Sequence, residues 1–379
     1  MSLDFLVPLK LQVTTRNKRI RLGFKVVAVT GTAGKTTTKE MIASILRLSR
    51  TVKSTPGNLN LPVHVRQIIE AATLGDTTLV LELGMARPGQ ISQSSYMAAP
   101  DVAIVTNVNR GHVEKCGSMA GVILAKSEII RGMGAGSVLI INADDHGSQL
   151  LRLEGFQGRI IKYGKAPEAN YRIVKCETQG LETTFVVHAE SEQRTLTIPI
   201  AGEHNAHNAT AAVAATRVLG CSWSDIECGL TKFSRLRGRL TPYGGINNSV
   251  VLDDSFNANP LSVVAGLKTL KAAAGGRTAI AVLGNMEEQG PKWPIIHMQL
   301  GREVAAIRVD RLITVGGKAA YIARGAESAG MLKEKIHAFV TRAGAIELLQ
   351  KLLDSNTMVL VKGSHSAGLS QVVKAIICM

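Results

Sequence analysis

Short runs of β-branched residues alternate with stretches of helical period, and this alternation constrains the fold more than any other feature of the sequence. Four runs are apolar almost throughout: KVVAVT (25–30), TTLVLEL (77–83), DVAIVTN (101–107) and SVLIIN (137–142). Strands that are buried on both faces have this pattern, and they belong to parallel sheets covered by crossover helices. The sequence therefore predicts an α/β fold with a mostly parallel sheet.

Two segments refine this prediction. Thr36 to Arg50 places Met41, Ile45 and Leu48 on one face of an expected helix. Residues 159–200 differ from the rest, because the runs RIIKY, YRIVKC, TTFVVHA and RTLTIPI follow one another without helices between them. We therefore expect an antiparallel patch on the same domain.

The stretch FSRLRGRLTPY (233–243) interrupts the alternation with charge and glycine, and strands and helices resume at SVVLDD (249–254). This change favours a domain boundary near Arg237 to Thr241. Two domains suit 379 residues, since single cores stop growing near roughly 250 to 300 residues. The predicted organisation is a lead-in segment at 1–24, a P-loop-containing central domain at 25–238 and a smaller α/β domain at 239–379.

Composition narrows the class of protein. No apolar run reaches the roughly 18 residues needed to cross a bilayer, and Asp4 and Pro8 stand where a secretory signal would be apolar. The five cysteines are odd in number and form no CxxC pair, which indicates neither a zinc site nor a disulfide framework. We expect a cytoplasmic protein without membrane insertion.

The net charge of +15 would attract polyanions at long range. The basic residues are scattered, however, without the blocks or interleaved aromatic residues typical of single-strand binders. We therefore expect sites for anionic small molecules and no nucleic acid partner. A nucleic-acid-binding NTPase stays an alternative that salt-dependent binding would test.

The first strand runs directly into the loop TGTAGKTTT (30–38), which opens into a helix. Glycines allow such a loop to curl so that successive N–H groups point at a phosphate, while Lys35 neutralises the outer phosphates and Thr36 can ligate magnesium. The first glycine of the common phosphate-loop pattern would fall at Val29, so this loop is a variant. The sequence predicts a nucleotide-phosphate site here.

A second constellation consists of Glu82 at the end of a strand, followed by His112 and Lys126. Doubly wound sheets bind ligands at the carboxyl ends of their strands, so Glu82 is placed to hold a metal. Taken alone, His112 would be interpreted as a structural histidine and Lys126 as a solvated helix charge.

Nine motifs, in order from about Lys25 to the C-terminus, resemble those of the Mur ligase family. They are GTAGKTTTKE (31–40), ELGMARPGQI (82–91), VTNVNRGHVEKCGSMAGVILAKSEI (105–129), NADD (142–145), GEHNAHNATAAVAA (202–215), RGRL (237–240), LDDSFNANPLS (252–262), VLGNMEEQG (282–290) and KGSHSAG (362–368). They are most similar to the member type that adds D-alanyl-D-alanine to a UDP-muramoyl peptide.

The resemblance implies an ATP-dependent amide ligase whose second domain is Rossmann-like. A small-molecule acid acceptor takes the γ-phosphoryl group of ATP and becomes an acyl phosphate, and an amine or amino-acid donor then displaces phosphate. A monomer is expected. Two Mg²⁺ sites are implied: Thr36 helps to hold one with the ATP phosphates, and Glu82 and His112 help to hold the second. The resemblance also implies that Lys126 is carbamylated by carbon dioxide, which would turn a cation into an anion supporting the second metal.

The resemblance also assigns nucleotide contacts and catalytic groups. His204, Asn205 and Asn208 would hold the adenine side, although asparagine caps at a helix N-terminus would explain the same segment. The implied nucleotide-binding residues are Gly31, Thr32, Gly34, Lys35, Thr36, Thr37, His204, Asn205, Asn208, Arg239 and Asp254. The implied catalytic residues are Lys35, Lys126, His112 and Arg239.

Other residues at the second domain have local explanations. Asn257 and Asn259 are expected to shape the turn and the start of a helix at Pro260. Lys362, Ser364 and His365 fall where the family places groups near the amine, and His365 replaces the arginine usual in the D-alanyl-D-alanine type.

Two departures leave the acceptor open. Only 24 residues precede the first strand, so the N-terminal UDP-binding domain of cell-wall ligases is expected to be missing. The segment TPGNLNLP (55–62) resembles an acceptor loop of the family shortened by about three residues. A ligase for a non-UDP acid, of the folate, poly-amino-acid or tetrapyrrole type, is one alternative. A non-catalytic ATP-binding partner subunit is the other, although it should have lost Lys35, Glu82 or Lys126.

Overall fold

The computed structural model describes residues 6–111 and 113–378 of the chain. The chain divides into two compact units, each with its own sheet. Unit 1 comprises Met1–Cys176, Thr184–Ile198 and Asn205–Phe233, and unit 2 comprises Glu177–Thr183, Pro199–His204 and Ser234–Met379. Among the described residues, no helix is long and apolar enough to cross a membrane.

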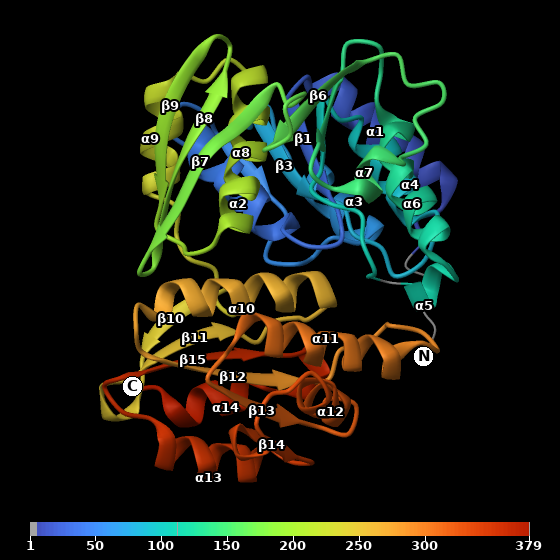
Figure 1. The fold of residues 1–379 in the computed structure, drawn as a ribbon. Coiled ribbons are helices and arrows are strands. Elements are labelled where there is room, and N and C mark those ends of the chain that lie inside the picture. The colour runs from blue at the N-terminus through green and yellow to red at the C-terminus, as the bar shows by residue number, and fades with distance from the viewer. Residues whose placement is uncertain (1–5, 112, 379) are drawn as a thin grey trace. The chain divides into compact units, whose positions relative to one another are not determined.

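Unit 1 is built on a nine-stranded sheet with the order β2-β3-β1-β4-β5-β6-β7-β8-β9 (Figure 1). Its strands are β1 (Lys25–Thr30), β2 (Val52–Ser54), β3 (Thr78–Glu82), β4 (Val102–Val105), β5 (Val138–Asn142), β6 (Arg159–Gly164), β7 (Tyr171–Gln179), β8 (Glu182–Ala189) and β9 (Glu192–Ile198). From β2 to β7 every pair of neighbouring strands is parallel. The mostly parallel sheet expected from the buried apolar runs is confirmed.

The antiparallel patch is shorter than predicted. Strand β6, which contains the RIIKY run, pairs parallel with β5 and with β7, so its assignment to the antiparallel patch was wrong. Two-residue connections join β7 to β8 and β8 to β9, and connections this short require antiparallel neighbours. Residue alternation reports which faces are buried but not strand direction, and therefore it could not separate β6 from the strands that follow.

The helices of this part of the chain are α1 (Leu9–Leu22), α2 (Lys35–Leu46), α3 (Pro62–Glu70), α4 (Gln90–Ala98), α5 (Val113–Cys116), α6 (Met119–Ser127), α7 (His146–Gln149), α8 (Glu203–Val218) and α9 (Trp223–Thr231). Helix α2 buries Met41 and Ile45 as expected. It ends at Leu46, where the backbone tightens because Leu48 N bonds to Ile45 O. Leu48 therefore leaves the buried face and is 39% exposed, contrary to the prediction.

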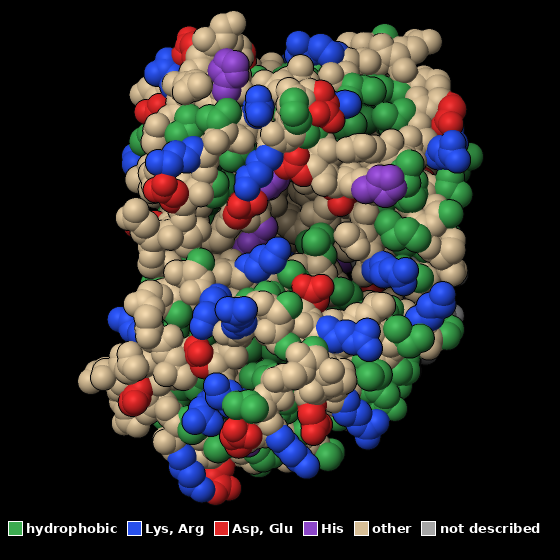
Figure 2. Space-filling view, in the orientation of Figure 1, with side chains coloured by type: hydrophobic (Ala, Val, Ile, Leu, Met, Phe, Trp, Pro, Cys, Tyr) green, Lys and Arg blue, Asp and Glu red, His purple; other side chains and the backbone are tan. Residues whose placement is uncertain are grey.

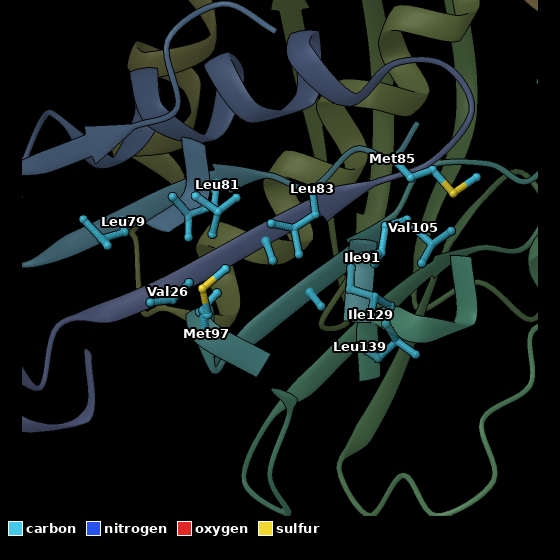
Figure 3. Packing of buried hydrophobic residues seen from close by; sticks show 14 of the residues in the cluster. Val26, Leu79, Leu81, Leu83, Met85, Ile91, Met97, Val105, Ile129 and Leu139 are labelled. Atoms are coloured by element: carbon cyan, nitrogen blue, oxygen red, sulfur yellow. The ribbon is translucent and has the colours of Figure 1, made fainter. Parts of the chain in front are cut away.

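One apolar layer of unit 1 joins β1, β3, β4 and β5 to α4. Figure 3 shows Val26, Leu79, Val105 and Leu139 of these strands together with Ile91 of the helix, and all of them belong to one buried cluster. Each fully buried side chain of this kind contributes about 1.5–3 kcal/mol relative to exposure. This layer fixes the sheet whose carboxyl edge carries the motifs.

Helix α1, within the segment expected to be a lead-in, faces the protein with polar side chains. Gln12, Thr15 and Arg19 are buried, whereas Leu9 is 70% exposed. Arg19 donates to Ala98 O at 3.0 Å and pairs with Asp101. These hydrogen bonds hold the helix to unit 1, together with Leu11 and Leu22, which pack against the apolar cluster.

Unit 2 contains a six-stranded sheet with the order β10-β11-β15-β12-β13-β14 (Figure 1). Its strands are β10 (Thr241–Gly244), β11 (Val250–Asp254), β12 (Thr278–Gly284), β13 (Arg311–Val315), β14 (Ile336–Phe339) and β15 (Thr357–Lys362), and its helices are α10 (Pro260–Ala274), α11 (Trp293–Ile307), α12 (Ala320–Ser328), α13 (Arg342–Leu352) and α14 (Ser370–Ile376). Only β10 is antiparallel, at an edge. Two apolar clusters cover the sheet, one with α10 to α12 and one with α13 and α14.

The start of α10 follows the sequence prediction. The Asn259 side chain caps the helix by accepting from Ser262 N at 2.9 Å, and Pro260 occupies the first turn. An N-cap side chain satisfies one of the helix's unpaired N–H groups, and proline lacks the N–H that would need a partner there. The expectation for Asn259 is confirmed.

Helices α11 and α12 approach each other through glycines. A Cβ atom placed on Gly301 would lie 2.0 Å from Ile322 O, and one on Gly325 would lie 2.1 Å from Met298 O. Both obstacles are backbone atoms, which cannot rotate away. The contact between the two helices therefore requires residues without a side chain at these positions.

We expect Gly301→Ala to lower the free energy of unfolding by about 1–3 kcal/mol, because the added methyl group forces the two backbones apart. Gly317→Ala is the matched control, since nothing lies within 4 Å of a Cβ atom there. Urea denaturation of both variants checks this. Equal stability of Gly301→Ala and Gly317→Ala would contradict the close approach.

Candidate active site

The loop between β1 and α2 is shaped by side chains from the end of β4. Asn107 Oδ1 accepts from Ala33 N at 2.9 Å, and Thr106 Oγ1 donates to Ala33 O at 2.6 Å. A Cβ atom on Gly31 would lie 2.0 Å from Thr106 Oγ1, and Gly31 also has a φ of 146°. Glycine is therefore required where β4 approaches the loop. Thr106 and Asn107 lie within the motif at 105–129, but the sequence predicted no role for either residue.

Lys35 and Thr36 begin α2, directly after Gly34 in the left-handed conformation. Lys35 Nζ donates to Gly31 O at 3.0 Å, so its amine lies over the loop's own backbone. Thr32 is held by the Thr32 N to Asn107 O bond of 2.9 Å. The predicted residues thus lie in one continuous stretch that comprises the loop after β1 and the first turn of α2: Gly31, Thr32, Gly34, Lys35, Thr36 and Thr37.

Glu82 ends β3 beside this loop, and its side chain is held on both oxygens. Thr36 Oγ1 donates to Glu82 Oε2 at 2.8 Å, and Asn60 Nδ2 donates to Glu82 Oε1 at 2.8 Å. Glu82 is 1% exposed. A buried carboxylate is costly unless it is hydrogen-bonded, and these two donors meet that requirement. The structure therefore brings Glu82 and Thr36 together, and Asn60 is a partner that sequence reasoning missed.

Lys126, at the end of α6, is fully buried, and its amine has no hydrogen-bond partner among the described residues. Burial, followed by the positive charge of Lys35, lowers the pKa of Lys126 to about 7, although Cys116, Glu128 and Glu82 act in the opposite direction. The interpretation of Lys126 as a solvated helix charge, which the residue taken alone favoured, is therefore wrong, and near neutral pH the amine is close to half deprotonated. The predicted site residue His112 lies outside the described residues.

The two asparagines of GEHNAHN lie within α8, not at its N-cap, so the alternative explanation as helix caps is wrong. Asn208 Nδ2 donates to Asn205 Oδ1 at 3.2 Å. A Cβ atom on Gly34 would lie 2.3 Å from Asn208 Oδ1. Asn208 therefore packs on the phosphate loop, and Asn205 orients its amide.

His207 of the same helix binds Asp144 of the NADD motif, with 2.7 Å between Nε2 and Oδ2. Asp144 also accepts from Lys165 N at 2.6 Å and Ala166 N at 2.8 Å. Burial alone would raise the pKa of Asp144, but these hydrogen bonds and the nearby histidine outweigh it and lower the pKa to about 2. The hydrogen bond between His207 and Asp144 fixes the loop after β5 to the first turns of α8.

In unit 2, Asp254 and Lys362 form a buried ion pair at the ends of adjacent strands β11 and β15. Lys362 Nζ donates to Asp254 Oδ2 at 2.6 Å. Burial raises the pKa of Asp254, while Lys362 and Arg239 act to lower it. The structure therefore places Asp254 near Arg239.

Arg239 also lies over the ring of Phe256, 4.3 Å from its centroid. The Phe256 ring in turn makes an edge contact with His365, with 6.3 Å between centroids. His204 lies beside Gly202, where a Cβ atom would come within 2.7 Å of its Cε1. The Arg239, Phe256 and His365 side chains thus form a row within unit 2.

No group of three or more His, Cys, Asp or Glu side chains that could hold a metal occurs in the described parts of the chain. Mg²⁺ does not need such a group, because it is usually held by one or two carboxylates together with substrate phosphates and waters. The Thr36 hydroxyl and the Glu82 carboxylate are hard oxygen ligands 2.8 Å apart beside the phosphate loop. These residues fit a magnesium ion that also binds phosphate.

Charged side chains on the face in Figure 2 do not form one basic block. Lys and Arg side chains are interspersed with carboxylates and uncharged surface. The positive balance of the sequence is therefore spread over this face.

Two family descriptions match the chain: "Mur ligase middle domain" over residues 29–216 and "Mur ligase, glutamate ligase domain" over residues 238–365. The chain belongs to the Mur ligase family. It is 32% identical to the UDP-N-acetylmuramoyl-tripeptide--D-alanyl-D-alanine ligase of Escherichia coli (strain K12), over 93% of this chain and 76% of that protein. The ligase of the same name from Bacillus subtilis (strain 168) is 30% identical, over 94% and 76%.

Solved structures agree with this assignment. A MurF crystal structure from Acinetobacter baumannii superposes with a TM-score of 0.88 at 30% identity, covering 97% of this chain and 79% of that chain. MurF from Thermotoga maritima in complex with ADP has a TM-score of 0.85 over 99% of this chain and 86% of that chain, and its 24% identity shows the fold alone. The predicted fold class and family are confirmed.

The buried Lys126 predicts a pH-dependent stability. Its pKa is about 7 when folded and 10.5 as an ordinary lysine, so between these values the unfolded chain binds a proton that the folded chain lacks. Stability rises with pH wherever the unfolded state binds more protons. The gain in stability from Lys126→Met should therefore be greatest at and below pH 7 and should shrink toward pH 10.

Urea denaturation from pH 6.5 to 10 in CO₂-free buffer measures this difference. The exposed Lys268→Met, on α10, is the control and should keep the wild-type dependence on pH. A constant difference between Lys126→Met and wild type across this range would contradict a deprotonated Lys126.

Proposed function

We propose that this chain is an ATP-dependent ligase of peptidoglycan biosynthesis that joins D-alanyl-D-alanine to a UDP-N-acetylmuramoyl tripeptide. The carrying observation is the Glu82 carboxylate, bound by Thr36 of the phosphate loop at the carboxyl edge of the sheet. The curated ligases of that name, up to 32% identical over 93% of this chain, support the substrates.

The reaction has two balanced steps. A carboxylate oxygen of the tripeptide attacks the γ-phosphorus of ATP, and the bond between this phosphorus and the oxygen that bridges it to the β-phosphate breaks. The products of this step are ADP and an acyl phosphate. The amine of the dipeptide then attacks the acyl carbon, inorganic phosphate leaves, and the amine loses a proton. Both steps require polyanions to be held side by side, which calls for fixed cations and N–H groups.

The residues of unit 1 supply these groups. The turn at Gly31 to Thr37 offers backbone N–H groups and a helix N-terminus to phosphate. Lys35 would leave its bond to Gly31 O, 3.0 Å long, to pair with an outer phosphate. Asn205 and Asn208 would hold the adenine side from α8. The packing of Asn208 on Gly34 beside the phosphate loop, with its amide oriented by Asn205, supports this.

We further propose one magnesium at Thr36, beside Glu82, where it would supply charge neutralisation at the phosphates. Glu82 and His112 would help to hold a second magnesium, supported by Lys126. For Lys126, a neutral amine can attack CO₂ at carbon, forming an N–C bond and releasing a proton to give a carbamate. Its burial, its pKa of about 7 and the lack of a hydrogen-bond partner for its amine among the described residues support this modification.

From unit 2, Arg239 and Asp254 would reach the phosphates and the ribose, with His204 on the adenine side. Here we take residues 25–238 and 239–379 as the two catalytic domains, following a segment at 1–24. The family matches at 29–216 and 238–365 support this division. The Arg239 guanidinium is held over the Phe256 ring, and this fixed cation supports a role for Arg239 in binding the nucleotide.

Purified protein with ATP, Mg²⁺, UDP-N-acetylmuramoyl tripeptide and D-alanyl-D-alanine tests the function, with phosphate release and the mass of the product as readouts. We expect ADP, phosphate and one amide product. Phosphate release only with a different acid or amine would show that the chain is a ligase for other substrates. ATP binding without any amide product would instead identify a non-catalytic subunit.

We expect Lys35→Ala to lower kcat/KM by about 10² to 10³-fold, the cost of removing one transition-state donor. Lys126→Ala should lose comparable activity, and added acetate should restore part of it by supplying the missing carboxylate. Lys25→Ala is the control, because Lys25 is exposed at the opposite end of β1. Full activity of Lys126→Ala without acetate would argue against the carbamate.

A further inference from the structure

A second lysine of α2, Lys39, is fully buried one helical turn beyond Thr36. Its Nζ donates to Thr55 O, to Gly57 O at 3.1 Å, and pairs with Glu40 Oε1 at 2.8 Å. An ammonium group has three N–H donors, and all three therefore have partners. Lys39 ties α2 to the start of the segment 55–61.

An apolar side chain would pack a helix against a loop without the cost of burying a charge, which is several kcal/mol per ion. A buried donor, unlike an apolar side chain, can form hydrogen bonds with carbonyl groups of the loop that point inward. Thr55 O and Gly57 O are such groups. Gly57 has a φ of 50°, which turns the loop sharply between Thr55 and Asn60. Lys39 thus determines the path of this loop.

The same loop holds Glu82 from the side opposite Thr36. Thr55 Oγ1 accepts from Glu82 N at 2.9 Å, and Asn60 Nδ2 donates to Glu82 Oε1 at 2.8 Å. Asn60 O accepts from Gly84 N at 2.8 Å, which fixes the residue just beyond β3. A closed ring of contacts therefore runs from α2 through Glu82 and the loop, and back to α2 at Lys39.

We propose that Lys39 is a positioning residue that holds the segment 55–61 against the sheet edge, so that Asn60 and Thr36 orient the Glu82 carboxylate before substrates bind. With one hydrogen bond on each oxygen, the carboxylate keeps about two of its four lone-pair sites for a cation. The catalytic consequence rests on the proposed ligase function, whereas the contact between Lys39 and the loop does not.

The test uses Lys39→Met, which keeps the length of the side chain and removes its donors. Hydrogen exchange of the ligand-free protein should show the Gly84 and Thr55 amides exchanging at least about tenfold faster, while the midpoint of urea unfolding stays near wild type. In the ligase assay kcat should fall by about 10 to 100-fold, the range for partners of metal ligands, with KM for ATP little changed.

Lys53→Met is the matched control. Lys53 lies on β2, two residues before Thr55, but its amine binds Ala71 O at 2.7 Å and Asp76 at 2.8 Å, away from Glu82. It should leave both exchange at Gly84 and kcat unchanged. Loss of kcat in Lys53→Met equal to that in Lys39→Met would show a general effect of weakening this edge and would overturn the proposal.

Wild-type exchange at Gly84 and wild-type kcat in folded Lys39→Met would also overturn it. If Lys39→Met does not fold, Asn60→Ala tests the same ring from the loop, and wild-type kcat in that variant rejects the proposal. If the wild-type protein shows no ligase activity, the proposed function fails. The exchange measurement still decides whether Lys39 positions the loop.

Discussion

The hydrogen-bonded Glu82 carboxylate is the interaction on which the rest of unit 1 depends. It lies at 1% exposure, where an unpaired charge would be prohibitively costly, and its two oxygens are held by Thr36 and Asn60. The three partners come from a strand end, a helix N-terminus and a loop. Any change that moves one of these elements leaves a buried charge without a donor, so the site and the local stability are coupled.

The charges around this carboxylate are arranged for anions. Burial disfavours protonation of Lys126, and the positive charge of Lys35 adds to this effect. An arriving polyphosphate, or an added carboxylate on Lys126, would relieve that repulsion. A site in which one lysine charge disfavours protonation of a second lysine is therefore suited to the family's reaction, which brings two polyanions together.

Sequence patterns succeeded where one local interaction decides the outcome. The cap at Asn259, the strand-to-loop-to-helix turn at Lys35 and the buried strands needed no knowledge of distant residues. Sequence patterns failed where the outcome depends on the direction of a strand or on packing against distant residues. Alternation could not show that β6 is parallel to β5, and the last turn of α2 moved Leu48 off the buried face. Asn60, Thr106 and Asn107 gave no signal of their own, because their partners are 22 or more residues away.

The sequence by itself determined the α/β class, the family and the order of the motifs, since these follow from residue periodicity and from short segments with fixed internal geometry. Only the tertiary structure decided the environment of each group: that Lys126 is buried and lacks a partner among the described residues, that Lys39 binds a loop, and that Asp254 is paired with Lys362. The reason is physical. Burial and charge pairing depend on atoms brought together from distant parts of the chain, and a linear pattern does not specify those distances.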